Sequence, residues 1–355
     1  MRLRVFGIPT VTGAGTHSNN IFNVLKRMHG DILQVEWYNN EDLSKVQGAY
    51  SDSQNSDINI FLYFIVDVAP LFKGRKYFWY AFESTKPMHD LNLIYDQFDF
   101  VITPSKWGYE CLTNNGAPKN RTFVIPEGVN SWQFHPFLRP LNKDKSITRF
   151  LMIGKFENRK GYYEGLKAFA YAYEKKQNIE LWTKPDMISG PKAQIGAEYV
   201  NYLRELPDLP IQTYTGLYSL NQMRRLYYAC DFFLFPSKCE GWGLPLIEAL
   251  ACGIPCIACN FGGQSEFLRL INDDYISIPY KLNDINCEIW KKSYPQKDNF
   301  WGKWAEIDPI KLSEILIEVC DKDFSKSAIK SSKIIRENFS WEQSASKLLD
   351  LIFKN

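Results

Sequence analysis

Short apolar runs alternate with amphipathic stretches along most of this chain, a pattern typical of parallel α/β sheets. The runs at 3–8, 58–66 and 100–103 have the length and composition of buried strands. A proline-broken, charged segment at 136–146 interrupts the alternation as a linker would, and the pattern restarts at 149–153. A chain of 355 residues is long for one compact core and sufficient for two. We therefore expect an α/β fold of two doubly wound, Rossmann-like domains that face a central cleft.

Local signals predict where some helices begin. A glycine-rich segment at 10–20 follows the first expected strand, and apolar residues then recur at helical spacing from 21 to 28. We expect 10–20 to be a loop and the first helix to follow it. Ser219 and Gln222 have the spacing of a capping box at a helix start. A last helix is expected from about Trp341.

Composition narrows the classes of protein that fit. The hydrophobic and charged fractions, 45% and 23%, are those of a globular protein, and the net charge of +2 argues against a broad nucleic-acid-binding face. The apolar run at 60–66 is too short to span a bilayer, and the opening residues MRLRVFGIPT do not resemble a signal peptide. We interpret the eight scattered cysteines as reduced thiols of a cytoplasmic protein.

The stretch CEGWGLPLIE (239–248) places two glutamates eight positions apart, around two glycines and a proline. Pro245 suits the first turn of a helix, where its missing N–H costs nothing. Gly253 suits the residue just past a helix end. We therefore expect a helix over 244–252, with a strand at 232–235 pointing at its start. Ligands of doubly wound sheets bind at such a junction.

The two glutamates would then lie on either side of the helix start. Glu240 lies in the loop before the helix, and Glu248 lies about one turn inside it, with its side chain tilted back toward the N-terminus. Gly241 and Gly243 let the backbone approach a ligand closely. The amides of Gly243 and Leu244 form an anion site with the positive end of the helix. A molecule with hydroxyls on both sides of a diphosphate, such as a nucleotide sugar, fits this pattern.

Three segments resemble the retaining glycosyltransferases of the GT-B fold, family 4 or glycosyltransferase group 1. The segment at 233–267 resembles the Glu-x7-Glu signature of that family. The segment at 154–169 resembles its phosphate-contacting loop and helix, and the segment at 215–231 resembles the element beside the nucleotide base. The N-terminal part of the chain is similar to the family only in outline.

The resemblance implies a domain organisation in three parts. They are an N-terminal Rossmann-like, acceptor-side domain at 1–140, a C-terminal Rossmann-like, nucleotide-sugar-binding domain at 148–335, and a C-terminal helix at 336–355 that packs back on the N-terminal domain.

The resemblance also implies the role of individual residues at the donor. Glu240 matches the family's catalytic glutamate beside the donor sugar, and Glu248 matches the glutamate that accepts hydrogen bonds from the ribose. Lys160 matches the lysine on the diphosphate. Lys155 stands where many relatives have arginine, an exchange that keeps the charge and loses the planar fork. The other implied donor-binding residues are Gly13 and Gly15, which face the diphosphate from the N-terminal domain, Leu217 and Tyr218, which line the base, and Gly241, Gly243 and Leu244.

The sequence departs from the family pattern on the acceptor side. Many relatives have histidine where this chain has Phe82, directly before Glu83, and often also where it has Glu127. His17 and Glu83 are the acceptor-side candidates that this chain offers instead.

Simpler interpretations compete with these roles. Acidic residues near a helix start can merely complement the helix dipole, although this explains one glutamate and not the glycine spacing. Lys155 and Lys160 could belong to a solvated basic loop, and Arg159 is expected at the surface or in a salt bridge. His17 could be a loop histidine without a catalytic duty.

Taken together, we expect a retaining glycosyltransferase that moves a sugar from a nucleoside diphosphate sugar, a UDP- or GDP-sugar, to an acceptor hydroxyl in polysaccharide or glycoconjugate synthesis. No cofactor and no metal are required, since the helix dipole and cations hold the diphosphate. The expected location is the cytoplasm, with peripheral association at the inner membrane face as an option, and the acceptor is a sugar, a lipid-linked sugar or another glycoconjugate.

Two alternatives stay open. One is a transferase that acts on protein or on modified nucleic acid, for which activity should depend strongly on salt if the substrate is nucleic acid. The other is a non-catalytic GT-B scaffold that binds a donor or a partner enzyme. Hydrolysis of the donor in the absence of acceptor would separate an enzyme from a scaffold.

Overall fold

The computed structural model describes residues 2–9, 13–29, 34–39, 43–62, 66–136, 146–186, 192–272 and 274–354. It divides into two compact units. The N-terminal unit comprises Met1–Gly128, Ser293–Gly302 and Phe339–Asn355, and the C-terminal unit comprises Val129–Lys292 and Lys303–Asn338. Of the expected linker at 136–146, residues 137–145 lie outside the described ranges.

The N-terminal unit is built on a six-stranded parallel sheet with the order β2-β1-β3-β4-β5-β6. The strands are β1 (Arg2–Gly7), β2 (Gln34–Asn39), β3 (Ile58–Leu62), β4 (Arg75–Trp79), β5 (Phe100–Thr103) and β6 (Thr122–Val124). All of β3 is buried, as expected of a central parallel strand that is covered on both faces. Of the strand predicted over 58–66, residues 63–65 lie outside the described ranges, and Val66 begins a 3-10 helix.

Charged side chains inside this sheet are paired. Arg4, on β1, is fully buried, and its guanidinium contacts Asp57 at 2.5 Å and Asp52 at 2.8 Å. Aromatic rings fill the adjoining core, where the rings of Phe6 and Phe61 stack with centroids 4.5 Å apart. Much of the high aromatic content of this unit is therefore packing.

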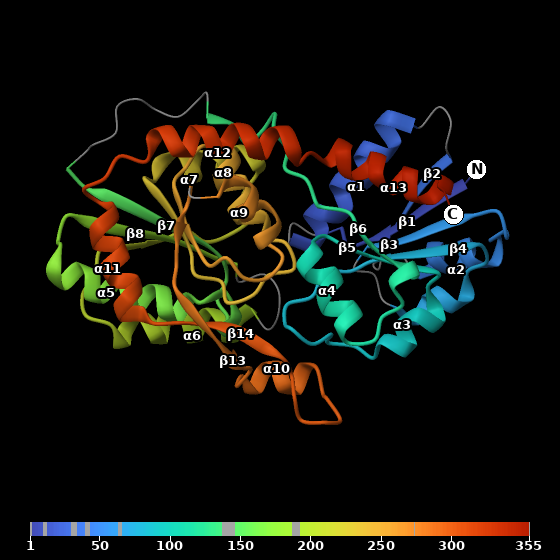
Figure 1. Cartoon of the computed structure of the whole chain (residues 1–355), viewed down its shortest axis with the longest axis horizontal. Helices are drawn as coiled ribbons and strands as arrows, with labels where there is room; N and C mark the ends of the chain where they lie inside the picture. The colour runs from blue at the N-terminus through green and yellow to red at the C-terminus, as the bar shows by residue number, and fades with distance from the viewer. Residues whose placement is uncertain are drawn as a thin grey trace. The chain divides into compact units, whose positions relative to one another are not determined.

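Helices flank this sheet (Figure 1). They are α1 (Gly13–His29), α2 (Leu43–Ser51), α3 (Leu91–Gln97), α4 (Lys106–Asn114) and α13 (Trp341–Lys354), with 3-10 helices at Val66–Leu71 and Lys119–Arg121.

The first helix begins earlier than predicted. α1 starts at Gly13, inside the segment at 10–20 that was expected to be a loop, and residues 10–12 lie outside the described ranges. The Ser18 hydroxyl donates to the Ala14 carbonyl at 2.8 Å and accepts from the Ile8 amide at 3.4 Å. A small polar side chain that suits loops thus bonds within the first turns of a helix.

The C-terminal unit contains a second six-stranded parallel sheet, with the order β12-β11-β10-β7-β8-β9. Its strands are β7 (Thr148–Lys155), β8 (Ile179–Asp186), β9 (Ile211–Thr213), β10 (Phe232–Phe235), β11 (Cys256–Ala258) and β12 (Ile276–Ser277). Numbered within the unit and read from β9, this is the order 3-2-1-4-5-6 of dinucleotide-binding sheets. A separate antiparallel pair joins β13 (Tyr280–Asp284) to β14 (Lys303–Ile307).

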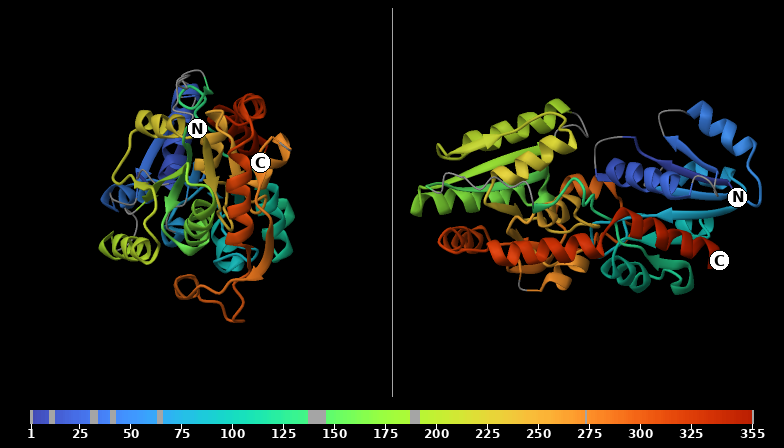
Figure 2. Two further views of the ribbon diagram at one scale, coloured as in Figure 1. Left: turned by 90° about the vertical axis from the view of Figure 1, so that its left-hand side faces the viewer. Right: turned by 90° about the horizontal axis from the view of Figure 1, so that it is seen from above.

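Helices of this unit lie on both faces of its sheet, where α5 packs against α11 and α12 packs against α8 and α9 (Figures 1 and 2). The helices are α5 (Tyr162–Lys175), α6 (Lys192–Glu205), α7 (Leu220–Ala229), α8 (Leu244–Ala251), α9 (Ser265–Ile271), α10 (Glu288–Ser293), α11 (Pro309–Val319) and α12 (Ser325–Asn338).

Two predictions of local structure in this unit are confirmed. The helix expected over 244–252 is α8, with Pro245 in its first turn and Cys252 as its C-cap. Gly253 follows with a φ of +69°, a left-handed conformation that glycine adopts without strain. The capping box of Ser219 and Gln222 opens α7.

Two segments from the second half of the chain belong to the N-terminal unit. In the first, 293–302, Asp298 forms an ion pair with Lys86 at 2.5 Å, and Gln296 donates to the Met88 carbonyl at 3.2 Å. No pattern in the sequence predicted this return, which interrupts the range 148–335 expected to form one domain.

The second segment contains α13, which packs beside α1. A Cβ atom on Gly128 would lie 2.2 Å from the backbone nitrogen of Trp341, so the helix start fits only against glycine. The Ser344 hydroxyl donates to the Pro126 carbonyl at 2.6 Å. The end of the chain thereby completes the N-terminal unit.

Candidate functional site

The order of the second sheet places a switch point between β7 and β10. These neighbouring parallel strands continue into connections that run in opposite directions along the sheet, β7 toward β8 and β10 toward β11. The loops at their carboxyl ends therefore diverge and leave a crevice, which is where doubly wound sheets bind ligands. The loop after β7 contains Lys160, and the loop after β10 contains Glu240.

These two loops are fastened to each other by close backbone contacts. The Lys238 amide donates to the Arg159 carbonyl at 2.8 Å. Gly161 has a φ of +66°, and a Cβ atom there would lie 1.9 Å from the Pro236 carbonyl oxygen. Any other residue at 161 would push the loops apart, so glycine is required here by conformation and by space.

A third loop, which follows β11, supports the backbone of Glu240. The Gly263 amide donates to the Glu240 carbonyl at 2.6 Å, and a Cβ atom on Gly263 would lie 1.8 Å from the Gly241 carbonyl oxygen. Gly262 has a φ of +89° and lies against the same peptide. No role was predicted for this glycine pair, although two adjacent glycines four and five residues after a buried strand were the available signal.

The carboxylate of Glu240 is buried between two cations. Only 4% of the residue is exposed. Lys160 Nζ lies 2.7 Å and 2.8 Å from its two oxygens, and Arg159 Nη1 lies 3.1 Å from Oε2. The Ser237 hydroxyl also donates to it. Burial opposes ionisation, but the charges of Lys160 and Arg159 outweigh it and hold the pKa of Glu240 well below its usual range.

Helix α8 begins four residues after Glu240, and because Pro245 has no N–H, the amides before Leu246 at this end are those of Gly243 and Leu244. Its N-cap, Gly243, has a φ of +100° and no side chain that could accept hydrogen bonds from those amides. Backbone bonds within the helix begin with the Leu246 amide, which donates to the Gly243 carbonyl at 3.0 Å. The earlier amides and the helix dipole suit an anion.

Glu248 lies one turn inside α8 in a different environment. The residue is partly buried, and its carboxylate accepts a hydrogen bond from the Tyr227 hydroxyl at 2.8 Å. The same hydroxyl lies 3.1 Å from the Pro245 carbonyl oxygen. Burial raises the pKa of Glu248 to about 7, and the bond from Tyr227 offsets only part of that effect. The two glutamates of the signature therefore differ in charge near neutral pH.

Lys184, for which no role was predicted, lies beside the segment predicted to line the nucleotide base. Lys184, at the end of β8, is 8% exposed and donates to the Gly216 carbonyl at 3.0 Å. Its Nζ lies 4.7 Å from the centre of the Tyr218 ring. Leu217, which lies between Gly216 and Tyr218 in the sequence, is 62% exposed. Lys155, the other predicted cation, is partly buried at the end of β7.

The predicted residues of the N-terminal unit follow β1 and β4. Gly13 is exposed and Gly15 is buried in the first turn of α1. The sheet order places a switch point between β1 and β3, so α1 starts at the ligand-binding edge of this sheet. Glu83 is partly buried after β4, and Phe82, where relatives have histidine, is buried in the aromatic core.

His17 is placed for packing. It is fully buried, and its Nδ1 lies 3.0 Å from Glu127 Oε1. Its ring meets those of Trp79 and Trp341 edge-on, with centroids 4.7 Å and 5.6 Å away. This placement does not favour contact with an acceptor, and it explains how the departure at Glu127 is accommodated.

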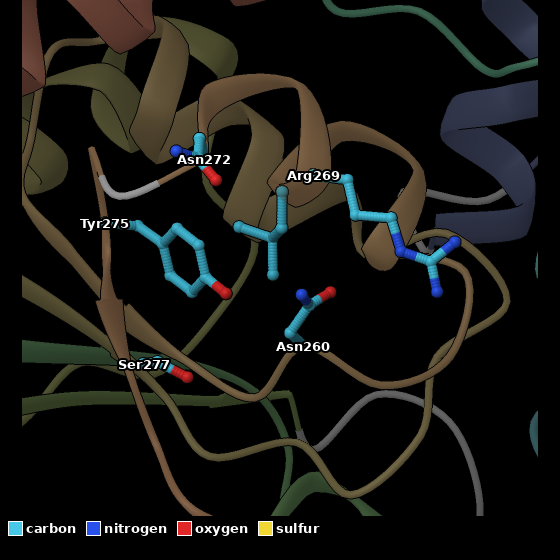
Figure 3. Close-up of a pocket in the computed structure, with 6 residues that line it drawn as sticks. Asn260, Arg269, Asn272, Tyr275 and Ser277 are labelled. Atoms are coloured by element: carbon cyan, nitrogen blue, oxygen red, sulfur yellow. The ribbon is translucent and has the colours of Figure 1, made fainter.

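A hollow of about 330 Å³ also lies in the C-terminal unit, lined by Leu268 and by Asn260, Arg269, Asn272, Tyr275 and Ser277 (Figure 3). It shares no residue with the predicted donor site, and we assign it no role. All eight cysteines are free thiols. Within the described ranges, no helix has the length and apolar character needed to cross a membrane, and no cluster of three or more potential metal ligands occurs.

Comparisons with known proteins find similar sequences and a similar fold. Residues 136–289 match the family model of glycosyl transferases group 1. An uncharacterized glycosyltransferase of Methanocaldococcus jannaschii is 20% identical over 286 residues, which are 76% of this chain and 64% of the relative. The UDP-Gal:alpha-D-GlcNAc-diphosphoundecaprenol alpha-1,3-galactosyltransferase of Escherichia coli is 25% identical over 59% of this chain and 56% of that relative.

The fold is shared with solved structures. The crystal structure of Anabaena HepE in complex with UDP-glucose matches with a TM-score of 0.73 at 14% identity, over all of both chains. The chain thus has the GT-B fold, and it carries the sequence pattern of the group 1 glycosyl transferases over residues 136–289. Its alignments span less than two thirds of the length of the two relatives above.

Proposed function

We propose that this protein is a retaining glycosyltransferase of family 4, which transfers a sugar from a nucleoside diphosphate sugar to an acceptor hydroxyl. One observation carries the proposal. At the β7/β10 switch point, Lys160 and Glu240 meet beside the start of α8, with Glu248 one turn further along that helix. A nucleotide sugar needs a positive site for its diphosphate and hydrogen-bond acceptors for its sugar and ribose, and this arrangement offers both.

Each group then has a part in binding the donor. Lys160 and the first amides of α8 neutralise the diphosphate. Glu248 accepts hydrogen bonds from the ribose hydroxyls, and Leu217 and Tyr218 line the base with Lys184 behind them. Lys155, at the end of β7, adds positive charge before the loop that contains Lys160.

Glu240 acts on the sugar. As the bond from the anomeric carbon to the diphosphate breaks, its electron pair goes to the leaving oxygen and positive charge grows on the ring. A carboxylate that stays ionised stabilises that charge. The acceptor oxygen bonds to the anomeric carbon, and its proton passes to the departing diphosphate. We do not assign Glu240 as a covalent nucleophile, because its two oxygens are already bonded to Arg159 and Ser237.

The acceptor is proposed by class. HepE was solved with UDP-glucose, and the Escherichia coli relative is named for UDP-Gal and a diphosphoundecaprenol-linked sugar. These names favour a UDP-sugar donor and a lipid-linked or other glycoconjugate acceptor, reached from the cytoplasm.

A thermal-shift screen tests the function. UDP, GDP, ADP and their common sugars are each added at millimolar concentration, and a ligand of the native state raises the melting temperature by mass action. We expect one base series to raise it by several degrees and the matching nucleotide sugar to release free nucleoside diphosphate slowly without acceptor. If no nucleotide shifts the melting temperature, the proposal fails. Binding without any turnover would indicate a donor-binding scaffold.

The pKa of Glu248 makes nucleotide affinity dependent on pH. Because the carboxylate accepts hydrogen bonds more strongly than the neutral acid, binding draws Glu248 toward its ionised form and releases a proton. With a pKa of about 7 in the free protein, affinity should rise up to about tenfold between pH 6 and pH 8. Calorimetry at several pH values measures this effect.

The matched control is Glu248→Gln, which has no carboxyl to titrate and should lose this dependence, leaving only that of the ligand phosphates. Tyr227→Phe removes the hydrogen bond to the carboxylate and should move the transition to higher pH. An unchanged pH dependence in Glu248→Gln would contradict the assignment.

A further inference from the structure

The ion pair between Lys160 and Glu240 conflicts with the proposed role of Lys160, which is to neutralise the diphosphate of the donor. Lys160 Nζ contacts both oxygens of Glu240, at 2.7 Å and 2.8 Å. If Lys160 turns to a diphosphate, Glu240 loses that cation while its burial persists. A buried carboxylate without a counter-charge tends to take up a proton, and a neutral acid cannot stabilise positive charge on the sugar.

Arg159 is the second cation on Glu240, and it is held more firmly than Lys160. Its guanidinium donates to the Cys239 carbonyl at 2.8 Å, to Glu240 Oε2 at 3.1 Å and to Glu157 Oε1 at 3.0 Å. Its side chain is 6% exposed, against 16% for Lys160. The contact with the Cys239 carbonyl fixes the guanidinium to the residue next to Glu240.

The backbone of Arg159 is fixed as well. Its carbonyl accepts from the Lys238 amide at 2.8 Å. The loop after β10 thus holds Arg159 at both ends, through the main chain and through the guanidinium. An arginine in this setting cannot lose its proton and cannot swing toward a ligand without breaking several bonds.

The other charged residues near Glu240 cannot replace Arg159 as its counter-charge. Lys238 is 3% exposed, but its Nζ is committed to Glu164 at 2.8 Å and lies 3.7 Å from Glu306. Glu157 lies on the far side of Arg159 and is 40% exposed at its side chain. The loop after β11 bonds the Glu240 backbone through Gly263. Among the ion pairs of the described residues, Glu240 therefore has Arg159 and Lys160 as its cations.

We infer that Arg159 is a positioning residue, which keeps the Glu240 carboxylate charged and oriented after Lys160 has turned to the diphosphate. The inference rests on the proposed function and divides the two neighbouring cations of the Arg159-Lys160-Gly161 turn. Lys160 exchanges Glu240 for the donor, and Arg159 stays.

The first experiment needs no donor. Glutamate carboxyl carbons are labelled with ¹³C, the Glu240 signal is assigned with Glu240→Gln, and its titration is followed by NMR. In Lys160→Ala, which mimics a departed lysine, Glu240 should still titrate below the usual glutamate range. Adding Arg159→Met should raise its midpoint by about one to three pH units. Lys238→Met, which removes a buried cation from the same loop without touching Glu240, is the matched control and should leave the midpoint unchanged.

Two results would overturn the inference. One is a Glu240 midpoint in Lys160→Ala that has already risen into or above the usual range, since Arg159 would then be insufficient. The other is an equal midpoint with and without Arg159. Lys160→Ala changes a partly exposed side chain and should fold, so the first comparison stands even if Arg159→Met does not fold.

The second experiment uses turnover. Arg159→Met should lower kcat and move the acidic limb of the kcat profile to higher pH, with donor KM nearly constant, and Arg159→Lys should recover part of kcat. A purely structural role would lower activity without moving the pH profile. Absence of turnover in the wild type would count against the proposed function, while the titration would still decide the part of Arg159.

Discussion

Replacing Glu240 with glutamine is expected to lower kcat by about two to three orders of magnitude, the usual loss when a group aimed at a developing charge is removed. Glutamine keeps the size and the hydrogen-bonding oxygen of glutamate and removes the negative charge between Lys160 and Arg159. Because the charge matters most when the sugar becomes cationic, donor KM should change little. Full donor kinetics of purified wild type and variant measure both constants.

The matched control is Glu248→Gln in the same signature. Glu248 contacts the ribose equally in ground and transition states, so its loss should raise donor KM, by about ten- to a hundredfold for hydrogen bonds to a charged group, and leave kcat nearly intact. If both variants raise KM alike and spare kcat, the division of labour is wrong. Because Glu240→Gln leaves Arg159 and Lys160 without their shared anion, melting curves must show that both variants are folded.

Replacing Lys160 with alanine should weaken binding of a nucleoside diphosphate by about ten- to a hundredfold, since a charge-assisted contact with a phosphate is lost. Binding of the corresponding nucleoside, which has no phosphate, should barely change. The difference between the two ligands is the diagnostic quantity, because a misfolded site would lose both. Calorimetry or competition with a fluorescent nucleotide measures it.

Lys176→Ala is a suitable control for this experiment. Lys176 also forms an ion pair in the C-terminal unit, with Asp321 at 2.9 Å, but at the end of α5 and away from the crevice loops. Its replacement should affect neither ligand. Equal losses for nucleoside and nucleoside diphosphate in Lys160→Ala would show that the lysine serves the structure of the loop and not the diphosphate.

The helix α8 and the capping box of α7 were predictable because their signals are local. Pro245 and Gly253 mark the two ends of α8 through backbone rules that act within a few residues. The spacing of Glu240 and Glu248 then follows from the helix itself. The capping box at Ser219 is predictable for the same reason.

The parts that were missed depend on contacts between distant segments. Small polar residues at 13–20 looked like a loop and form the first turns of α1, packed against β1. Arg159 was expected at the surface or in a salt bridge, and it does form salt bridges, with Glu157 and Glu240. Its burial was not predicted, because it follows from the loop after β10, about eighty positions away. The hydrophobic periodicity of the sequence did not predict that 293–302 belongs to the N-terminal unit. The contacts of this segment are with residues near 86–88, which are about two hundred positions away.

The sequence by itself determined the two parallel sheets, the start of α8 and the positions of Glu240 and Glu248 relative to it, since alternation, helix caps and glycine turns are properties of neighbouring residues. Only the tertiary structure decided what each charged group faces. It placed Glu240 between Lys160 and Arg159, and Glu248 against Tyr227. The pKa of a carboxyl is set by its burial and by the charges around it. Both depend on residues that are distant in the sequence, so neighbouring residues do not predict them.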